Sequence, residues 1–255
     1  MRIFTWRSFQ AIITDRRNKT TMYAIFRREL GSYFTSPVGY VVAAAFMIFN
    51  GVFFYVQCLY NGTSSMSTVF QSMFFILLFL IPLITMRLFA EDKHNRTDQA
   101  LLTSPVSIGA IVCAKFLSAL VLLVICLSAY IIDGIILSFV GSPDWGVIIG
   151  NILAMALMGS SFIAIGIFIS SLTESVIIAA VLSFAVNVLI SMVDTIASTI
   201  PWDWMKGIVS SLSFQSKYNS FSLGIISFAD IVFFFSAAAL FLFLTDRMID
   251  RRRWA

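Results

Sequence analysis

The chain alternates long apolar runs with short polar linkers. A helix of about 20 apolar residues crosses a hydrocarbon layer about 30 Å thick. Six runs approach or exceed that length, at residues 38–59, 69–89, 108–137, 147–172, 176–200 and 228–244. The pattern predicts an all-α polytopic membrane protein, with six transmembrane helices in one domain over residues 37–255.

The composition agrees with this pattern. Of the 255 residues, 59% are hydrophobic and 12% are charged, and the mean hydropathy is +0.93. Soluble domains carry about 25% charged residues. Two arginine pairs precede the first run, so we expect no cleaved signal peptide. The three cysteines (Cys58, Cys113 and Cys126) lack metal-ligand spacing, and no metal site is predicted.

The basic residues predict the orientation. They precede the first run, follow the last, and gather in the linker 87–105, whereas the linkers 61–68 and 133–145 hold none. Basic residues beside spans mark cytoplasmic ends, so both termini of a multi-pass cell-membrane protein are predicted to lie in the cytoplasm. Only Lys206 and Lys217 then fall outside. Because this pattern accounts for the basic clusters, we expect no nucleic-acid partner.

The tetrapeptide TSPV occurs twice, at residues 35–38 and 103–106. Serine before proline is a helix-start signal, because the serine oxygen caps free N–H groups and proline is tolerated at the first helical position. Both copies therefore predict a break between a cytoplasmic segment and a helix that enters the bilayer.

The first cytoplasmic segment, residues 22–36, repeats apolar residues at helical spacing. We expect an amphipathic helix in the membrane interface, with Arg27 and Arg28 toward lipid headgroups. Glu29 falls inside the apolar face, and we hypothesise that it pairs with a basic residue of the segment 87–96. Residues 1–21 are interpreted as an N-terminal extension, since Met22 is itself a candidate initiator.

The second cytoplasmic segment, "RLFAEDKHNRTDQALLTS", joins the second and third runs. Two acids and several bases precede a stretch long enough for about two helical turns, with Leu101 and Leu102 on one side. One interpretation is a solvated charged loop. The other is a short helix, over residues 91–103, that receives force from a soluble motor protein.

Three stretches resemble type-2 ABC exporter permeases, the membrane subunits of ATP-binding cassette exporters. The run "IPLITMRLFAEDKHNRTDQALLTSPVSIGAIVCAKF" is similar to the family's coupling helix and its flanks. "IGIFISSLTESVIIAAVLSF" resembles its junction between the fourth and fifth spans, and "FRRELGSYFTSPVGYV" its interfacial helix. The subgroup that the chain most resembles is the gliding-motility-type permease.

The resemblance assigns residues by position. It places Glu91, Asp92, Arg96, Thr97, Leu101 and Leu102 in the coupling region, and Glu174 at the inner end of the fifth span. A family Gly-Thr is Arg96-Thr97 here, which puts the bend before the coupling helix in doubt. Glu174 has a second interpretation, because Ser171 and Glu174 form an S-x-x-E capping box.

The chain has no G-x-x-x-x-G-K-[ST] phosphate loop. It is therefore not expected to be an enzyme, and ATP and magnesium would be bound by a partner. The resemblance implies two cytoplasmic ABC ATPase subunits and a second permease chain, the same or homologous. It also implies an outer re-entrant hairpin within residues 201–227, where a plain interfacial helix is the alternative. An extracytoplasmic accessory protein and membrane lipids are further candidate partners.

Polar residues inside the runs bear on mechanism. Asp133, Asp194 and Asp230 lie near predicted outer ends, and Lys115 lies near an inner end where it can extend to the interface. The lack of ionisable groups at mid-membrane argues against a proton-coupled carrier. Asn187 is interpreted as a helix-packing hydrogen bond or a path residue. The stripe Ala156, Ser160 and Ala164 predicts close helix packing.

These observations predict the permease subunit of an ATP-driven exporter, with a translocation path shared with a second permease. An aromatic content of 15% would suit a lipidic or amphipathic substrate. Two alternatives stay open. One is a membrane scaffold of a mechanotransmission or envelope-assembly complex that moves no solute, and the other is a secondary carrier that needs no ATP.

Overall fold

The computed structural model describes residues 22–97, 107–193, 213–222 and 227–253, which are helices joined by short turns without a strand among them. Five helical segments are long and apolar enough to cross a membrane, and they are Pro37–Tyr60, Ser67–His94, Ile108–Val140, Trp145–Leu172 and Phe228–Arg251. A sixth apolar helix, Val176–Ser191, is shorter. The all-α, multi-pass prediction is confirmed. The sixth span stays a prediction, because the run 176–200 extends beyond the described residues.

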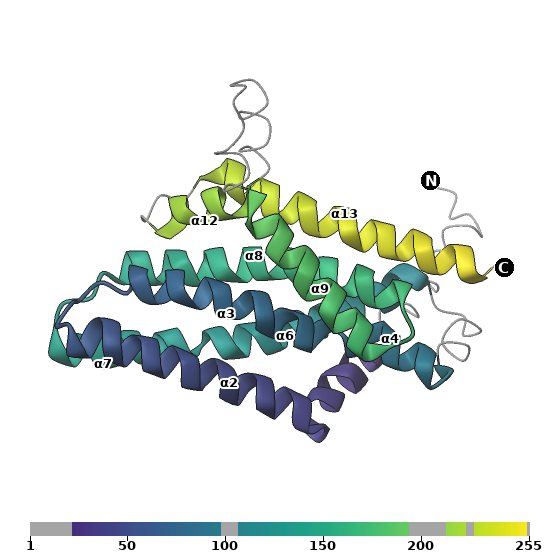
Figure 1. The fold of residues 1–255 in the computed structure, drawn as a ribbon, viewed down its shortest axis with the longest axis horizontal. Helices are drawn as coiled ribbons and strands as arrows, with labels where there is room; N and C mark the ends of the chain where they lie inside the picture. Colours follow the sequence, from purple (N-terminus) through teal and green to yellow (C-terminus); the bar gives the residue numbers. More distant parts are fainter. Residues whose placement is uncertain (1–21, 98–106, 194–212, 223–226, 254–255) are drawn as a thin grey trace, which may run out of the picture.

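The helices form an elongated bundle in which most of them follow the long axis (Figure 1). In chain order they are α2 (Pro37–Phe54), the π-helix η1 (Tyr55–Tyr60), α3 (Ser67–Thr85), α4 (Arg87–His94), α6 (Ile108–Leu127), α7 (Ala129–Val140), α8 (Trp145–Leu172), α9 (Val176–Ser191), α12 (Phe214–Ser222) and α13 (Phe228–Arg253). Residues 22–35 are also helical. Helix 22–35, α4 and the end of α13 lie at one end of the bundle, and α7 and α12 lie toward the other.

Helix α8 is the centre of the bundle, with α3, α6, α9, α12 and α13 packed around it. Two glycines allow this close packing. A Cβ atom on Gly159 would lie 2.4 Å from Leu123 Cδ2, and one on Gly166 would lie 2.2 Å from Thr85 Oγ1. In the predicted stripe, Ser160 and Ala164 are buried and Ala156 is partly buried. The closest approaches, however, are at the glycines, which the sequence interpretation missed.

The first TSPV copy starts α2 as predicted. The backbone N–H of Val38 donates to Ser36 Oγ at 3.3 Å, and Pro37 is the first helical residue. The second copy, residues 103–106, lies outside the described residues. Helix α6 begins at Ile108, after Ser107 in an extended conformation.

The long apolar segments contain two irregularities that the sequence did not indicate. The third segment breaks at Ser128 into α6 and α7, and the first ends in the π-helix η1. The predicted outer hairpin lies mostly outside the described residues. Its described part, α12, is buried through Phe214, Tyr218 and Phe221, and the Tyr218 hydroxyl donates to the Phe70 carbonyl at 3.2 Å.

Candidate functional site

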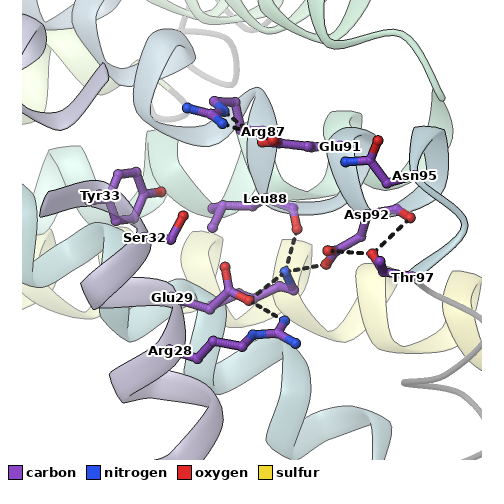
Figure 2. A pocket seen from close by; sticks show the side chains of 11 residues that line it. Arg28, Glu29, Ser32, Tyr33, Arg87, Leu88, Glu91, Asp92, Asn95 and Thr97 are labelled. Carbon is purple, nitrogen blue, oxygen red and sulfur yellow. Dashed lines mark hydrogen bonds and ion pairs between the residues drawn. The ribbon is translucent and has the colours of Figure 1, made fainter. Parts of the chain in front are cut away.

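A buried ammonium group joins three helices at one end of the bundle. Lys115 of α6 is 1% exposed. Its Nζ donates to Glu29 Oε1 of helix 22–35 at 3.1 Å, to Asp92 Oδ2 of α4 at 2.6 Å, and to the Leu88 carbonyl. Figure 2 labels Glu29, Leu88 and Asp92, the three residues whose oxygen atoms contact this group. We call this meeting of helix 22–35, α4 and α6 around Lys115 the junction.

One sequence prediction needs correction here, and it concerns Glu29. The ammonium group of Lys115, predicted to extend to the interface, is enclosed by three oxygen atoms of helix 22–35 and α4. The partners of Glu29 are Lys115 and Arg28, at 3.1 and 2.6 Å, and not a basic residue of the segment 87–96. Glu29 does lie inside the inward face of its helix, as predicted, with its side chain 12% exposed. Its hydrogen bond raises the pKa of the Arg28 guanidinium.

Arg87 connects α4 to the start of α2. Its guanidinium donates to both carboxylate oxygens of Glu91, at 2.6 and 2.8 Å, and to Ser36 Oγ at 2.6 Å. Nearby, the buried Tyr33 hydroxyl donates to the Ile84 carbonyl at 2.8 Å, and burial raises the pKa of this phenol well above its usual value. The pair with Glu91 lies within α4 and fixes the orientation of the Arg87 guanidinium. The hydrogen bonds from Arg87 to Ser36 and from Tyr33 to Ile84 then connect this region to the end of helix 22–35.

A serine near the end of α8 fixes the start of α4. Ser170 Oγ accepts hydrogen bonds from the N–H groups of Phe89 and Ala90, at 3.1 and 3.0 Å, and donates to the Met86 carbonyl at 3.0 Å. The first N–H groups of a helix lack partners within the helix, and Ser170 supplies one from another helix. Sequence reasoning missed this residue, since a serine in an apolar run has no distinctive pattern.

Helix α4 ends in a bend at Arg96, whose φ of 56° lies in the left-handed region. The Arg96 N–H donates to the Lys93 carbonyl at 3.0 Å, and Thr97 Oγ1 donates to Asp92 Oδ1 at 3.0 Å. The bend therefore persists without glycine. The predicted single helix over 91–103 is wrong, because α4 ends at His94 and the chain turns at residues 95–96. Leu101 and Leu102 lie outside the described residues.

The junction contains a cavity of about 270 Å³. It is lined by Arg28, Glu29, Ser32 and Tyr33 of helix 22–35, by Arg87, Leu88, Glu91, Asp92, Asn95 and Thr97 of α4 and its bend, and by Lys115. The structure thus brings together residues that the sequence assigned to two separate cytoplasmic segments. Arg27 is not in this cavity and lines a shallower hollow beside Tyr23 and Arg28.

Helix 22–35 also borders an apolar groove. Met22, Tyr23 and Phe26 face Leu117 and Val121 of α6 across a volume of about 330 Å³. The arginines and this groove lie on neighbouring sides of one helix, since Tyr23 lines both the groove and the arginine-lined hollow. The helix is therefore amphipathic, and its position at the membrane interface stays a prediction.

Glu174 lies close to the end of α4. Glu174, Ser175, Val176 and Ile177 line one hollow with His94, of about 370 Å³. The interpretation of Ser171 and Glu174 as a capping box is wrong. Ser171 Oγ donates to the Phe168 carbonyl inside α8, and Ser175 caps α9 by accepting from the Ile178 N–H. Glu174 is therefore an exposed residue of the α8–α9 connection.

The remaining predicted residues lie away from the junction, in the bundle. Asn187 is fully buried on a face of α9 that also includes Ala179, Ser183 and Ser191. Neither side-chain polar atom of Asn187 has a hydrogen-bond partner among the described residues. The prediction of a helix-packing hydrogen bond at Asn187 is therefore wrong in this conformation.

The sequence matches the model of one protein family. The family is described as ABC-2 family transporter protein, and the match covers residues 23–245. That range includes the junction, four of the five long apolar helical segments and most of the fifth, Phe228–Arg251, and it confirms the resemblance at the level of the family. No curated protein matches the sequence significantly. Permeases of this family work with a partner ATPase. Since the match spans most of the chain, this protein belongs to the ABC-2 transporter family and is a membrane permease of an ABC transporter.

Proposed function

We propose that this chain is the permease subunit of an ATP-binding cassette exporter, and that the junction receives movement from a separate ATPase subunit. The observation that carries this proposal is the buried Lys115, whose ammonium group holds α4, α6 and helix 22–35 together. A force on α4 is then passed to the third membrane segment and to the interfacial helix at once.

The energetics favour movement of the junction as one body. To separate α4 from α6, the Lys115 ammonium would have to leave Asp92 and the Leu88 carbonyl while still buried. Removing one partner of a buried ion pair costs about 3–5 kcal/mol. Hydrogen bonds from α4 to Ser170 add further resistance. A displaced α4 therefore carries α6 and the inner end of α8 with it.

The exposed side of the junction provides a composite docking surface for the ATPase. His94, Asn95, Arg96 and Thr97 are exposed at the end of α4, and Glu174 is exposed on the α8–α9 connection. His94 and Glu174 border the same hollow. We propose that one ATPase subunit contacts both connections, together with Leu101 and Leu102.

The wider assembly follows from the family and the charge pattern. We propose two ATPase subunits that bind ATP and magnesium, a second permease chain, and an orientation with both termini in the cytoplasm. In this orientation the junction is cytoplasmic. The six-span layout with an outer hairpin, and kinship with the gliding-motility-type subgroup, belong to the same proposal. Arg27 and the groove at Phe26 would contact lipids of the cytoplasmic leaflet.

Co-purification tests the docking surface. The double change Leu101→Asp/Leu102→Asp should abolish recovery of the ATPase with the tagged permease. In our proposal the two leucines dock into an apolar surface of the ATPase, and two carboxylates there would lose their water without gaining a partner. Thermal unfolding of this variant should match that of the unmodified chain. The matched control, Asn61→Asp/Thr63→Asp, adds the same charge to the exposed turn at the other end of the bundle and should retain the ATPase. Full recovery of the ATPase with the double variant would disprove docking through these leucines.

Flux in vesicles separates the functional classes. With a fluorescent phospholipid analogue as the probe, an exporter should move it only with both the ATPase and ATP. Movement without the ATPase would instead indicate a secondary carrier. ATP hydrolysis that responds to the permease, but drives no probe or solute flux, would support the scaffold alternative.

A further inference from the structure

A second ionisable residue of the third membrane segment is buried without a charged partner. Asp133 lies in α7, within the apolar segment Ile108–Val140, and is 7% exposed. Its Oδ2 accepts a hydrogen bond of 2.5 Å from Asn50 Nδ2 of α2. Asn50 lies 13 residues into the segment Pro37–Tyr60, about 20 Å from its start at 1.5 Å per residue. Asp133 lies seven residues before the end of its own segment at Val140, so the contact is inside the bundle but toward the end formed by α7.

Among the described residues, the groups around Asp133 offer it no positive charge. Cys58 of η1 and Tyr130 of α7 are close enough to interact electrostatically with the carboxylate, and both are neutral at ordinary pH. The neighbouring Gly134 faces Trp145 and Ile148 of α8. The basic residue that the structure describes toward this end of the bundle, Lys217, pairs with Asp230 at 3.0 Å.

Two buried polar groups of this region lack hydrogen-bond partners. Asn50 Oδ1 and the Tyr130 hydroxyl have no partner among the described residues, and both residues are at least nine-tenths buried. The Tyr130 hydroxyl can donate or accept, whereas Asn50 Oδ1 only accepts, and an ionised carboxylate also only accepts while a protonated one can donate. A proton on Asp133 therefore removes a buried charge and adds a donor beside the Asn50 amide, whose oxygen is an unsatisfied acceptor.

The backbone is irregular on both sides of the Asp133–Asn50 pair. The third segment breaks at Ser128, five residues before Asp133, and α2 gives way to the π-helix η1 at Tyr55, five residues after Asn50. Single π-helical turns occur frequently at functional sites. Irregular backbone at membrane depth is tolerated where it lies inside the protein. Both irregularities provide places at which α2 and α7 can change their packing.

We propose that Asp133 is a proton-binding site, neutral while α7 packs on Asn50, that releases its proton when these helices separate. On release the carboxyl O–H bond breaks, its electron pair stays on the carboxylate, and water on the far side of the membrane accepts the proton. When α7 packs on α2 again, the Asp133 carboxylate takes a proton back from water, and the O–H bond forms again. Proton binding is thereby linked to the packing of the first and third membrane segments.

Unfolding of the purified chain in detergent tests this site without any ATPase or substrate. A carboxyl group that is protonated when folded and ionised when unfolded loses its stabilising contribution as pH rises. The unfolding constant should therefore rise by up to tenfold per pH unit from this group. Asp133→Asn, which mimics the protonated acid, should remove that part of the pH dependence and leave stability at low pH nearly unchanged.

The matched control is Asp230→Asn, since Asp230 is a second buried acid of this chain but has Lys217 as a cationic partner. This variant should not flatten the pH profile in the same way. Infrared spectroscopy gives a direct readout, because a protonated carboxyl shows a carbonyl band that should vanish in Asp133→Asn. Identical pH profiles of Asp133→Asn and the unmodified chain, with no lost band, would overturn the proposal. Since no step uses the ATPase, this outcome would leave the exporter proposal intact.

Discussion

The third membrane segment carries two buried ionisable groups in contrasting surroundings. Lys115, in α6, is 1% exposed and contacts two carboxylates and a carbonyl. Asp133, in α7, is 7% exposed and contacts one neutral amide. Burial is similar at the two sites, but the partners that offset the loss of water around the charge differ.

The contrast lies in the partners of the two groups and not in their burial. At the junction, opposite charges offset the desolvation of the ammonium group, provided that all of them stay in place. At Asp133 no opposite charge is present among its described neighbours, and neutralisation by a proton is the remaining compensation. The first site is suited to transmit force, and the second to exchange a proton.

Removal of the ammonium group should give the largest effect. Lys115→Met leaves the partly buried Glu29 and Asp92 without their common cation, although Glu29 keeps Arg28 as a partner, and it should reduce the free energy of unfolding by about 2–3 kcal/mol. Reversible unfolding of the purified chain in detergent measures this loss. The control Arg251→Gln removes one exposed positive charge from α13 and should change stability by less than about 0.5 kcal/mol. A loss below about 1 kcal/mol for Lys115→Met would match an exposed ion pair, and it would contradict the view that Lys115 holds the junction together.

An intermediate effect is expected at the other site. Asn50→Leu removes the amide partner of Asp133, and at low pH it should cost about 1 kcal/mol, the typical net worth of one neutral hydrogen bond. The same unfolding experiment applies. If the cost equalled that of Lys115→Met, Asp133 would be ionised in the folded protein, and the contrast between the two sites would disappear.

The smallest effect concerns the bend that ends α4. Arg96 occupies a left-handed conformation with φ of 56°, which costs a non-glycine residue about 1–2 kcal/mol. Arg96→Gly should relieve this strain, and the more flexible unfolded chain offsets part of the gain. We expect stabilisation by about 0.5 kcal/mol, measured as a small rise in Tm. A lower Tm would show that the Arg96 side chain itself supports the junction.

The sequence predicted the local features of the junction but not its contacts. A helix within residues 22–36, the inward position of Glu29 and the capping of α2 by Ser36 were all predicted, and the structure has them. The partner of Glu29 was not, because Lys115 lies 86 residues away. Ser170 and Gly166 had no visible signal either, since small residues are common in apolar helices.

The sequence by itself determined that this chain crosses a membrane and where its helices begin. Hydrophobic length, basic flanks and Ser-Pro caps act over a few neighbouring residues, so they can be recognised without a fold. Only the tertiary structure decided which buried charges have partners, because those partners come from helices far apart in the chain. It placed two carboxylates around Lys115 and one amide beside Asp133, and that difference gives each site its chemistry.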